Sequence, residues 1–348
     1  MRITYTSAQL RKLRNLGIRP FDELIHDQPK KWLIENFSEG ATTYPVNVTR
    51  LMFNIIWQTR ERIVAGEKPL LRELIRTYWY MYIKPTLSRC DSLSDKPDDQ
   101  YRAMVDRFTD LVKTHRIMEY KDFGFRDVSR NNRLVGENGN IIIFAEKEGH
   151  MDILMDLNNQ YRVSVIALGG WPSVLNNEYF TDELKEKVHL NSSFYLFGIC
   201  DFDPFGRFIR YDFISNLERY GIKNIKVVDL VHPDMLTAEE VKHSRYRLST
   251  RTKRNRTITE EWFGEVTKKN YRNLKHLKET RRAGKKTETI YYGIESRAVS
   301  TKRIAEKLKE LVLPILGKSE DYLREYELSE LDRALGELIL FKIRRGER

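Results

Sequence analysis

Two acidic residues follow one apolar segment of the chain, and a third follows an earlier apolar segment. Asp201 and Asp203 come at the end of the apolar run 194–200, and Glu146 comes after the run 141–145. The carboxyl ends of parallel strands meet at one edge of a sheet, where open α/β sheets bind ligands. Mg²⁺ prefers hard oxygen ligands, usually one or two protein carboxylates with waters and substrate phosphates. The three acids therefore predict a magnesium site, although Asp-x-Asp before proline is also typical of an ordinary turn.

The segments around these acids alternate between strand-like and helix-like patterns. The strand-like runs are 141–145, 163–168, 194–200 and 225–231, and the helix-like runs between them are 148–158, 177–188 and 206–220. This alternation predicts repeated βα units, and right-handed crossovers would place the strands in one parallel sheet with helices on both faces.

Three motifs in this region resemble those of the Toprim domain in the topoisomerase VI A subunit and in its relative, the meiotic protein that makes double-strand breaks. They are Glu146-Lys147, Gly169-Gly170-Trp171-Pro172 and Asp201-Phe202-Asp203-Pro204-Phe205-Gly206, in the order and spacing of that family and with aromatic exchanges only. The resemblance implies that Glu146, Asp201 and Asp203 hold Mg²⁺ against the scissile phosphodiester of DNA. It leaves Lys147 as either a phosphate contact or a solvated side chain at a helix start, and it gives Gly170 and Pro172 a part in shaping a loop near DNA.

The segment 68–84 predicts one helix, with Pro69 in its first turn and Pro85 closing it. Helical spacing places Tyr78 and Tyr82 on an apolar row. It places Arg72, Arg76 and Tyr80 on another side, so that Tyr80 faces outward beneath two arginines.

Members of the resembling family carry a catalytic tyrosine upstream of the Toprim domain, in a motif Arg-x-(Ile/Leu)-Tyr-Tyr. Arg76-Thr77-Tyr78-Trp79-Tyr80 fits this motif with Trp79 in place of the first tyrosine, which makes Tyr80 the nucleophile and Arg76 its partner. A free phenol is mostly protonated at neutral pH, and an adjacent guanidinium favours the phenolate and stabilises charge on phosphate oxygens.

A second alignment of the same motif stays open. Leu71-Arg72-Glu73-Leu74 also matches the start of the motif, and in that register Ile75 and Arg76 replace the tyrosines, so the chain lacks its nucleophile. Tyr78 and Tyr82 are further candidates on the apolar row.

The charge of the chain suits a polyanionic partner. The 348 residues carry a net charge of +11, and cations that neutralise DNA phosphates release counterions. Basic residues gather between positions 245 and 286 with aromatic residues among them, and either a solvated helical face or a DNA contact explains them. The candidate DNA contacts are Lys147, Arg72, Arg251, Lys253, Arg254 and Arg256.

These patterns predict an α/β protein in which a helical winged-helix domain precedes a Toprim domain with a Rossmann-like parallel sheet. The expected parts are a helical extension at 1–67, a winged helix at 68–140, a Toprim domain at 141–297 and C-terminal helices at 298–348. Two cysteines rule out a disulfide framework or zinc cluster within this chain. The chain has no apolar run of membrane-spanning length, so we expect a cytoplasmic, DNA-associated protein that does not contact a membrane.

The resemblance implies a Mg²⁺-dependent transesterase that cuts double-stranded DNA as a homodimer, with Tyr80 of one subunit meeting the acids of the other. It also implies an ATP-binding B-type subunit as partner, because this chain has no nucleotide-binding motif. Two alternatives remain: a hydrolytic Toprim nuclease that uses no tyrosine, and a non-catalytic DNA-binding protein of a mobile element.

Overall fold

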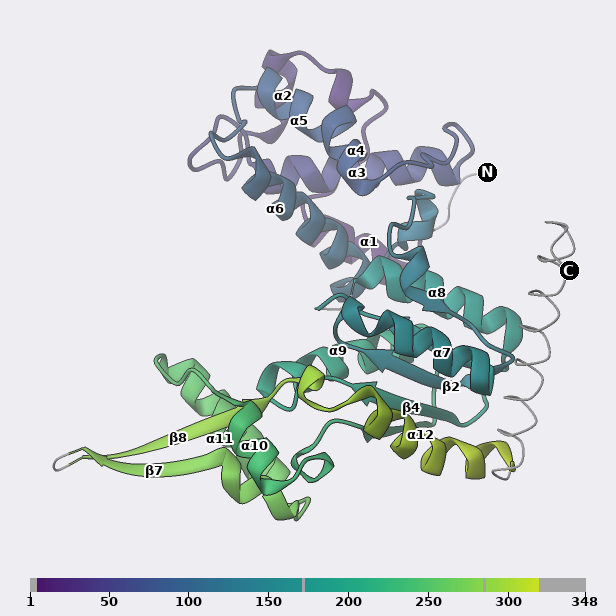
Figure 1. Cartoon of the computed structure of the whole chain (residues 1–348). Coiled ribbons are helices and arrows are strands. Elements are labelled where there is room, and N and C mark those ends of the chain that lie inside the picture. Colours follow the sequence, from purple (N-terminus) through teal and green to yellow (C-terminus); the bar gives the residue numbers. More distant parts are fainter. Residues whose placement is uncertain (1–4, 171–172, 284–285, 319–348) are drawn as a thin grey trace, which may run out of the picture. The chain divides into compact units, whose positions relative to one another are not determined.

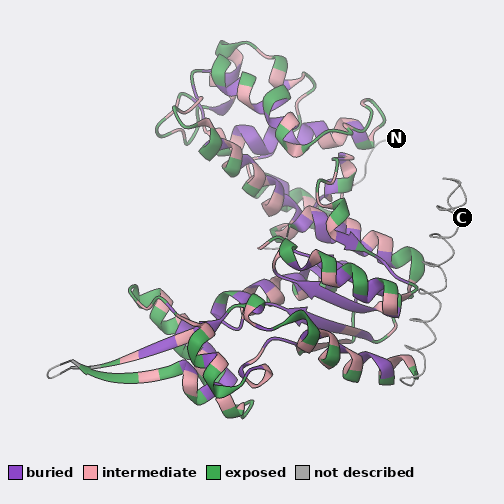
Figure 2. Cartoon of the chain, in the orientation of Figure 1, coloured by how far each residue is buried: buried purple, intermediate pink, exposed green. Residues whose placement is uncertain are grey.

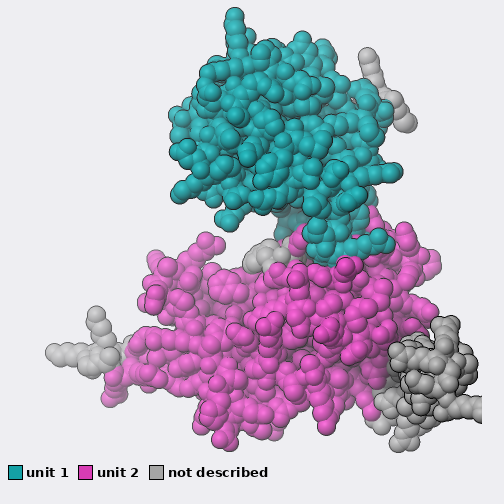
Figure 3. Space-filling view, turned by 45° about the horizontal axis from the view of Figure 1, so that its top comes forward, with its two compact units in different colours: residues 1–130, 174–179 teal, residues 131–173, 180–348 magenta. Residues whose placement is uncertain are grey.

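The computed structural model describes residues 5–170, 173–283 and 286–318. The chain divides into two compact units (Figure 3). The first contains residues 1–130 and 174–179, and the second contains residues 131–173 and 180–348.

The described part of the first unit is built of helices and turns around a single core. Helix α3 lies at its centre, with every residue from Leu51 to Thr59 buried. Two polar side chains on α3 are satisfied by the preceding loop: Asn54 accepts a hydrogen bond from Arg19 N at 2.9 Å, and Gln58 accepts one from Ile25 N at 3.0 Å. The helices are α1 (Ser7–Asn15), α2 (Lys30–Phe37), α3 (Val48–Val64), α4 (Ile75–Tyr78), α5 (Lys84–Arg89) and α6 (Pro97–Thr109), with π-helical turns η2 (Trp79–Ile83) and η3 (Asp110–Thr114).

This unit differs from the expected helical extension followed by a winged helix. Its core draws on both sides of position 67, because Phe53 and Ile56 pack with Tyr78 and Phe108. Among its described residues no strand occurs, whereas a winged helix needs a strand hairpin as its wing. The strands that begin within 68–140 belong to the sheet of the second unit.

The prediction of one helix over 68–84 is wrong at both ends. The helix begins at Ile75, because the residues before it are extended and bonded elsewhere: Leu71 N donates to Phe123 O at 2.9 Å, and Arg126 N donates to Glu73 O at 2.8 Å. Arg72 has a left-handed φ of 53°. Pro85 does not close the helix, which runs on through η2 and α5 to Arg89.

The second unit contains a five-stranded, mostly parallel sheet, as the alternating segments predict. The strand order is β1-β3-β2-β4-β5, and only β1 is antiparallel to its neighbour. The strands are β1 (Arg133–Leu134), β2 (Asn138–Ala145), β3 (Val163–Ala167), β4 (Phe194–Ile199) and β5 (Ile225–Asp229).

Helices cover both faces of this sheet, which confirms the predicted layers (Figures 1 and 2). Alternate residues of β2 enter two separate cores: Ile141 and Ile143 pack with α7 and α12, and Ile142 and Phe144 pack with α8 and α9. These helices are α7 (Met151–Tyr161), α8 (Val174–Lys187), α9 (Pro204–Arg219) and α12 (Thr301–Leu316). Helix α12 lies in the region 298–348 where C-terminal helices were predicted, and the part of that region from residue 319 on lies outside the described residues.

A second, antiparallel sheet follows β5, in a region for which the sequence predicted basic character but no strands. Its order is β6-β8-β7, and an isolated bridge between Phe202 and Ile294 connects it to the loop after β4. Its elements are β6 (Arg245–Arg247), β7 (Lys278–Ala283), β8 (Lys286–Ile294), α10 (Ala238–Ser244) and α11 (Lys253–Thr267). Across all described residues, no helix combines the length and the apolar composition needed to cross a bilayer.

Candidate functional site

The predicted acids lie where the strand order of the main sheet reverses direction. From β2 the chain passes to β3 on one side, and it then returns to β4 and β5 on the other side. Glu146 directly follows β2 and Asp201 follows β4, and these two strands are parallel neighbours. The carboxyl ends of strands at such a switch point form the usual ligand crevice of open α/β sheets. The sequence prediction that these acids share one edge is confirmed.

Backbone bonds fix the first two acids against each other. Glu146 N donates to Ile199 O at 3.1 Å, and Asp201 N donates to the Glu146 carboxylate at 2.9 Å. Asp201 in turn accepts a hydrogen bond from Ser296 N at 2.8 Å and forms an ion pair with Lys147 Nζ at 2.9 Å. Lys147 also lies 3.7 Å from the Glu295 carboxylate. Lys147 is therefore bound between two acids rather than free in solvent.

Asp203 is both a site residue and the N-cap of α9. Its carboxylate accepts a hydrogen bond from Gly206 N at 2.6 Å and another from the Tyr246 hydroxyl. Gly206 is required by packing, because a Cβ at this position would lie 2.1 Å from the backbone oxygen of Asp201. The Asp-x-Asp-Pro-x-Gly motif thus begins a helix and places two carboxylates at the sheet edge.

Burial and mutual repulsion raise the proton affinity of these carboxylates. Burial first, and then the charges of Asp201 and Asp203, raise the pKa of Glu146 above its ordinary value. Burial is also the main cause that raises the pKa of Asp203, against the hydrogen bond from Tyr246. Burial acts to lower the pKa of Lys147, but its bond to Asp201 outweighs this effect and the pKa is raised. The edge therefore carries three acids, Glu146, Asp201 and Asp203, and the ammonium group of Lys147 forms an ion pair with one of them, Asp201.

The donor chemistry of this edge fits Mg²⁺, because it offers carboxylate oxygens in a partly buried setting. Over residues 5–170, 173–283 and 286–318, however, no three His, Cys, Asp or Glu side chains converge closely enough to coordinate one ion as they stand. In the structure Asp201 is bonded to Lys147 and Ser296, and Asp203 is bonded to Gly206 and Tyr246. Glu146, Asp201 and Asp203 are the residues that could supply carboxylate ligands to a cation at this edge.

Sequence reasoning missed several residues that contact the acids or the partners of the acids. Tyr246, Glu295 and Ser296 come from the second sheet and the turn after it. His150, which bonds to the Ser296 hydroxyl at 3.0 Å, comes from the start of α7. No local pattern marks Tyr246, Glu295 and Ser296, because the pairing of β8 with Phe202 brings them to the edge.

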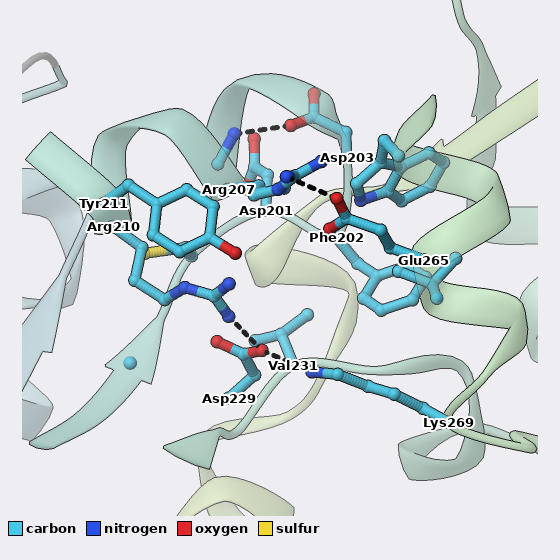
Figure 4. Close-up of a pocket in the computed structure, with 15 residues that line it drawn as sticks. Asp201, Phe202, Asp203, Arg207, Arg210, Tyr211, Asp229, Val231, Glu265 and Lys269 are labelled. Carbon is cyan, nitrogen blue, oxygen red and sulfur yellow. Dashed lines mark hydrogen bonds and ion pairs between the residues drawn. The ribbon is translucent and has the colours of Figure 1, made fainter. Parts of the chain in front are cut away.

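A cavity of about 80 Å³ lies beside Asp201 and Asp203, between α9, β5 and α11 (Figure 4). Its cations are paired: Arg207 donates to Glu265 at 2.7 Å, and Arg210 and Lys269 both bind Asp229. Burial acts to raise the pKa of Asp229, but Arg210 and Lys269 outweigh it and hold the pKa below its ordinary value. These ion pairs connect α9 to α11 and to β5 beside the acids.

Tyr80, the predicted nucleophile, lies on the surface of the helical unit with its side chain 49% exposed. It is part of η2, and Lys84 lies 5.0 Å from the centre of its ring. A hydrogen bond and electrostatic attraction from Tyr80 raise the pKa of Arg76, which also forms an exposed ion pair with Asp98 at 3.1 Å. Tyr78 and Tyr82 are buried in the core, as their apolar row predicts.

The other candidate DNA contacts fall at different places. Arg72 lies before the helix and not on a row with Tyr80, so that part of the prediction is wrong. Gly170 donates its N–H to Glu146 O at 2.7 Å with a left-handed φ of 95°, whereas Trp171 and Pro172 lie outside the described residues. The predicted contacts near α11 are all exposed, and they are Arg251, Lys253, Arg254 and Arg256.

A scan against models of protein families gives no match, and a search of curated proteins gives no significant match. The fold therefore defines the class: an α/β protein with an N-terminal helical region, followed by a mixed, mostly parallel five-stranded sheet with helices.

Proposed function

We propose that this protein is a Mg²⁺-dependent DNA-cleaving transesterase similar to the topoisomerase VI A subunit. The observation that carries the proposal is the placement of Glu146, Asp201 and Asp203 at the switch point of a parallel sheet. The excess of acids over the single paired ammonium group of Lys147 supports it, because excess negative charge at a ligand crevice favours a divalent cation. The net charge of +11 favours DNA as the substrate.

The three carboxylates would hold the cation, which supplies charge neutralisation at the phosphodiester. In this proposal Lys147 leaves Asp201 when the cation and the DNA arrive and then binds a phosphate oxygen. Tyr246 and Gly206 keep Asp203 in place through hydrogen bonds to its two oxygens.

Tyr80 is the proposed nucleophile. Its phenol gives up a proton to solvent water, and the phenol oxygen forms a bond to phosphorus while the bond from phosphorus to a deoxyribose oxygen breaks. The leaving deoxyribose oxygen takes up a proton from solvent and becomes a hydroxyl, and the reverse reaction rejoins the strand. Arg76 and Lys84, which lie beside Tyr80, contact the phosphate and stabilise the charge that develops on its oxygens.

Tyr80 and the acids belong to different units, so the proposal includes a homodimer in which each site combines the tyrosine of one subunit with the acids of the other. Two such sites would cut both strands of duplex DNA. The proposal also includes an ATP-binding B-type partner.

The test is cleavage of supercoiled DNA with Mg²⁺, analysed with and without protease. We expect Tyr80→Phe to reduce the covalent protein–DNA adduct to background while DNA binding is retained. Asp201→Asn should reduce cleavage by about a hundredfold or more. Tyr44→Phe, at a partly exposed tyrosine elsewhere in the helical unit, serves as the control and should form the adduct normally.

Two results would overturn the proposal in different ways. Protein-free ends with undiminished cleavage by Tyr80→Phe would identify a hydrolytic nuclease. DNA binding without cleavage under any divalent metal would identify a non-catalytic DNA-binding protein.

A further inference from the structure

The second sheet extends into a two-stranded ribbon made of β7 and the adjoining part of β8 (Figure 1). Lys278 lies opposite Tyr291, and Thr280 lies opposite Thr289. Since successive side chains of a strand point to opposite faces, the ribbon has two different faces. We call one the threonine face, with Lys278, Thr280, Arg282, Thr289 and Tyr291. We call the other the ion-pair face, with Glu279, Arg281, Glu288, Ile290 and Tyr292.

The two glutamates of the ion-pair face are paired with arginines. Glu279 forms ion pairs with Arg245 and with Arg281, the latter at 3.0 Å. Glu288 pairs with Arg247 at 2.5 Å. The exposed Arg281 of this face is therefore already paired within the protein.

The threonine face is different, because the ribbon places no acid on it. Thr280 and Arg282 are exposed, and neither Lys278 nor Arg282 forms an ion pair with any carboxylate of the described chain. Where the ribbon leaves the body, Tyr291 packs on Phe263 of α11 with ring centres 5.1 Å apart, and Glu260 is the acid that α11 brings toward Tyr291.

The same face continues to the carboxylate site. Tyr246 of β6 lies opposite Gly293, which is two residues from Tyr291 and so on the same face of β8. The hydroxyl of Tyr246 bonds to Asp203. The threonine face is therefore connected to the acids through Tyr246, and α11 covers the stretch between them at Tyr291.

The outer part of the ribbon contributes little to the stability of the fold. Its outer residues are threonines, arginines and a glutamate, and a two-stranded hairpin without a core is marginal in water. Charged side chains on the exposed edge of β7 would discourage aggregation. Protection against aggregation does not explain why Lys278 and Arg282, which lack an ion pair, lie on the same face.

We propose that the threonine face binds the phosphate backbone of duplex DNA beside the carboxylate site. Arg282 and Lys278 supply the cationic contacts, and Thr280 and Thr289 supply hydrogen-bond donors. A ribbon of two strands about 4.8 Å apart fits a major groove about 12 Å wide. The inference rests on the proposed DNA-cleaving function and identifies how that site would hold its substrate.

The experiment compares Arg282→Ala with Arg281→Ala in the full chain, because these adjacent, exposed arginines lie on opposite faces. Binding to a labelled duplex is measured by fluorescence anisotropy at several salt concentrations in EDTA. Arg282→Ala should weaken binding by about three- to tenfold, and the slope of log K against log salt should become shallower by about 0.9. Arg281→Ala should change affinity less than about twofold and leave the slope unchanged. Arg282→Lys should bind nearly as the unchanged protein does.

Equal effects of the two alanine variants, or no effect of Arg282→Ala, would overturn the assignment of the threonine face. Cleavage by the unchanged protein and by Asp201→Asn separates this result from failure of the proposed function. If Asp201 is needed for cleavage and both arginine variants bind normally, only the ribbon proposal fails. If Arg282 alone is needed for binding but Asp201→Asn cleaves normally, only the proposed function fails. Absence of DNA binding by the unchanged protein would overturn both.

Discussion

Lys147 places its ammonium group among the acids at the edge of the sheet. It bonds to Asp201 at 2.9 Å and lies near Glu295, and its pKa is raised by these contacts. Under the proposed function its ammonium group would compete with Mg²⁺ for the same carboxylate.

Replacing Lys147 with Met should separate metal binding from cleavage. Without the ammonium group, divalent cations should bind about tenfold more tightly, because Asp201 is no longer neutralised. Cleavage should fall by about a hundredfold, since the proposed phosphate contact is lost. Calorimetric titration with Mg²⁺ and a cleavage time course measure the two effects. Lys223→Met, at an exposed lysine elsewhere in the unit, is the control, and weaker metal binding by Lys147→Met would contradict the competition.

The sequence was sufficient to place Glu146, Asp201 and Asp203 at one edge of the sheet, because they follow two apolar segments that form parallel strands. It was insufficient for Tyr246 and Ser296. These residues lie 43 positions from Asp203 and 95 positions from Asp201, and they reach them only through the pairing of β8. Contacts of that separation leave no periodic pattern.

At the scale of elements, the βα segments were predictable because apolar periodicity is local. The start of the helix that carries Tyr80 was not, since the backbone bonds of Leu71 and Glu73 go to residues 123 and 126. The strands β6 to β8 were also missed, because their basic and hydroxyl residues lack the apolar alternation of a buried strand.

The π-helical turn η2 has an identifiable cause. Pro85 lacks an N–H, and in a regular helix its ring would clash with the carbonyl of Met81. The turn widens just before it, and Lys84 N bonds to Trp79 O rather than to Tyr80 O. Such turns occur frequently at functional sites, and this one contains Tyr80.

Pro85→Ala should restore regular helical hydrogen bonding and rotate Tyr80 relative to Arg76. We expect adduct formation to fall by about a hundredfold, while thermal stability is unchanged or increased. Protease-sensitive cleavage assays and thermal melts measure these effects. Pro97→Ala is the control, because Pro97 lies in the first turn of α6, where proline is tolerated. Normal adduct formation by Pro85→Ala would show that the turn does not position Tyr80.

At the scale of the whole molecule, each unit holds a partly buried histidine whose pKa is lowered. In the helical unit, burial is the main cause that lowers the pKa of His26, whose ring packs edge-on against Tyr82 at 4.8 Å. In the sheet unit, burial likewise lowers the pKa of His232, which stacks on Tyr271 at 4.8 Å. The unfolded chain therefore binds more protons than the folded chain just below pH 6.5.

Both units should lose stability as the pH falls. The contribution of each histidine is complete above about pH 6.5 and declines as the pH drops toward the lowered pKa of the folded state. Melting temperatures at pH 7.5 and 5.5 test this expectation. His232→Gln should reduce the pH dependence of the sheet unit, and His26→Gln should reduce that of the helical unit. An unchanged pH dependence in both variants would contradict it.

The double engagement of Asp203 has an evolutionary consequence. Because this carboxylate begins α9 as well as facing the site, selection for folding alone is enough to retain it. Neither Asp201 nor Glu146 caps a helix. In a lineage that lost the chemistry, substitutions should therefore accumulate first at Glu146 and Asp201, and Asp203 should be the last of the three acids to disappear.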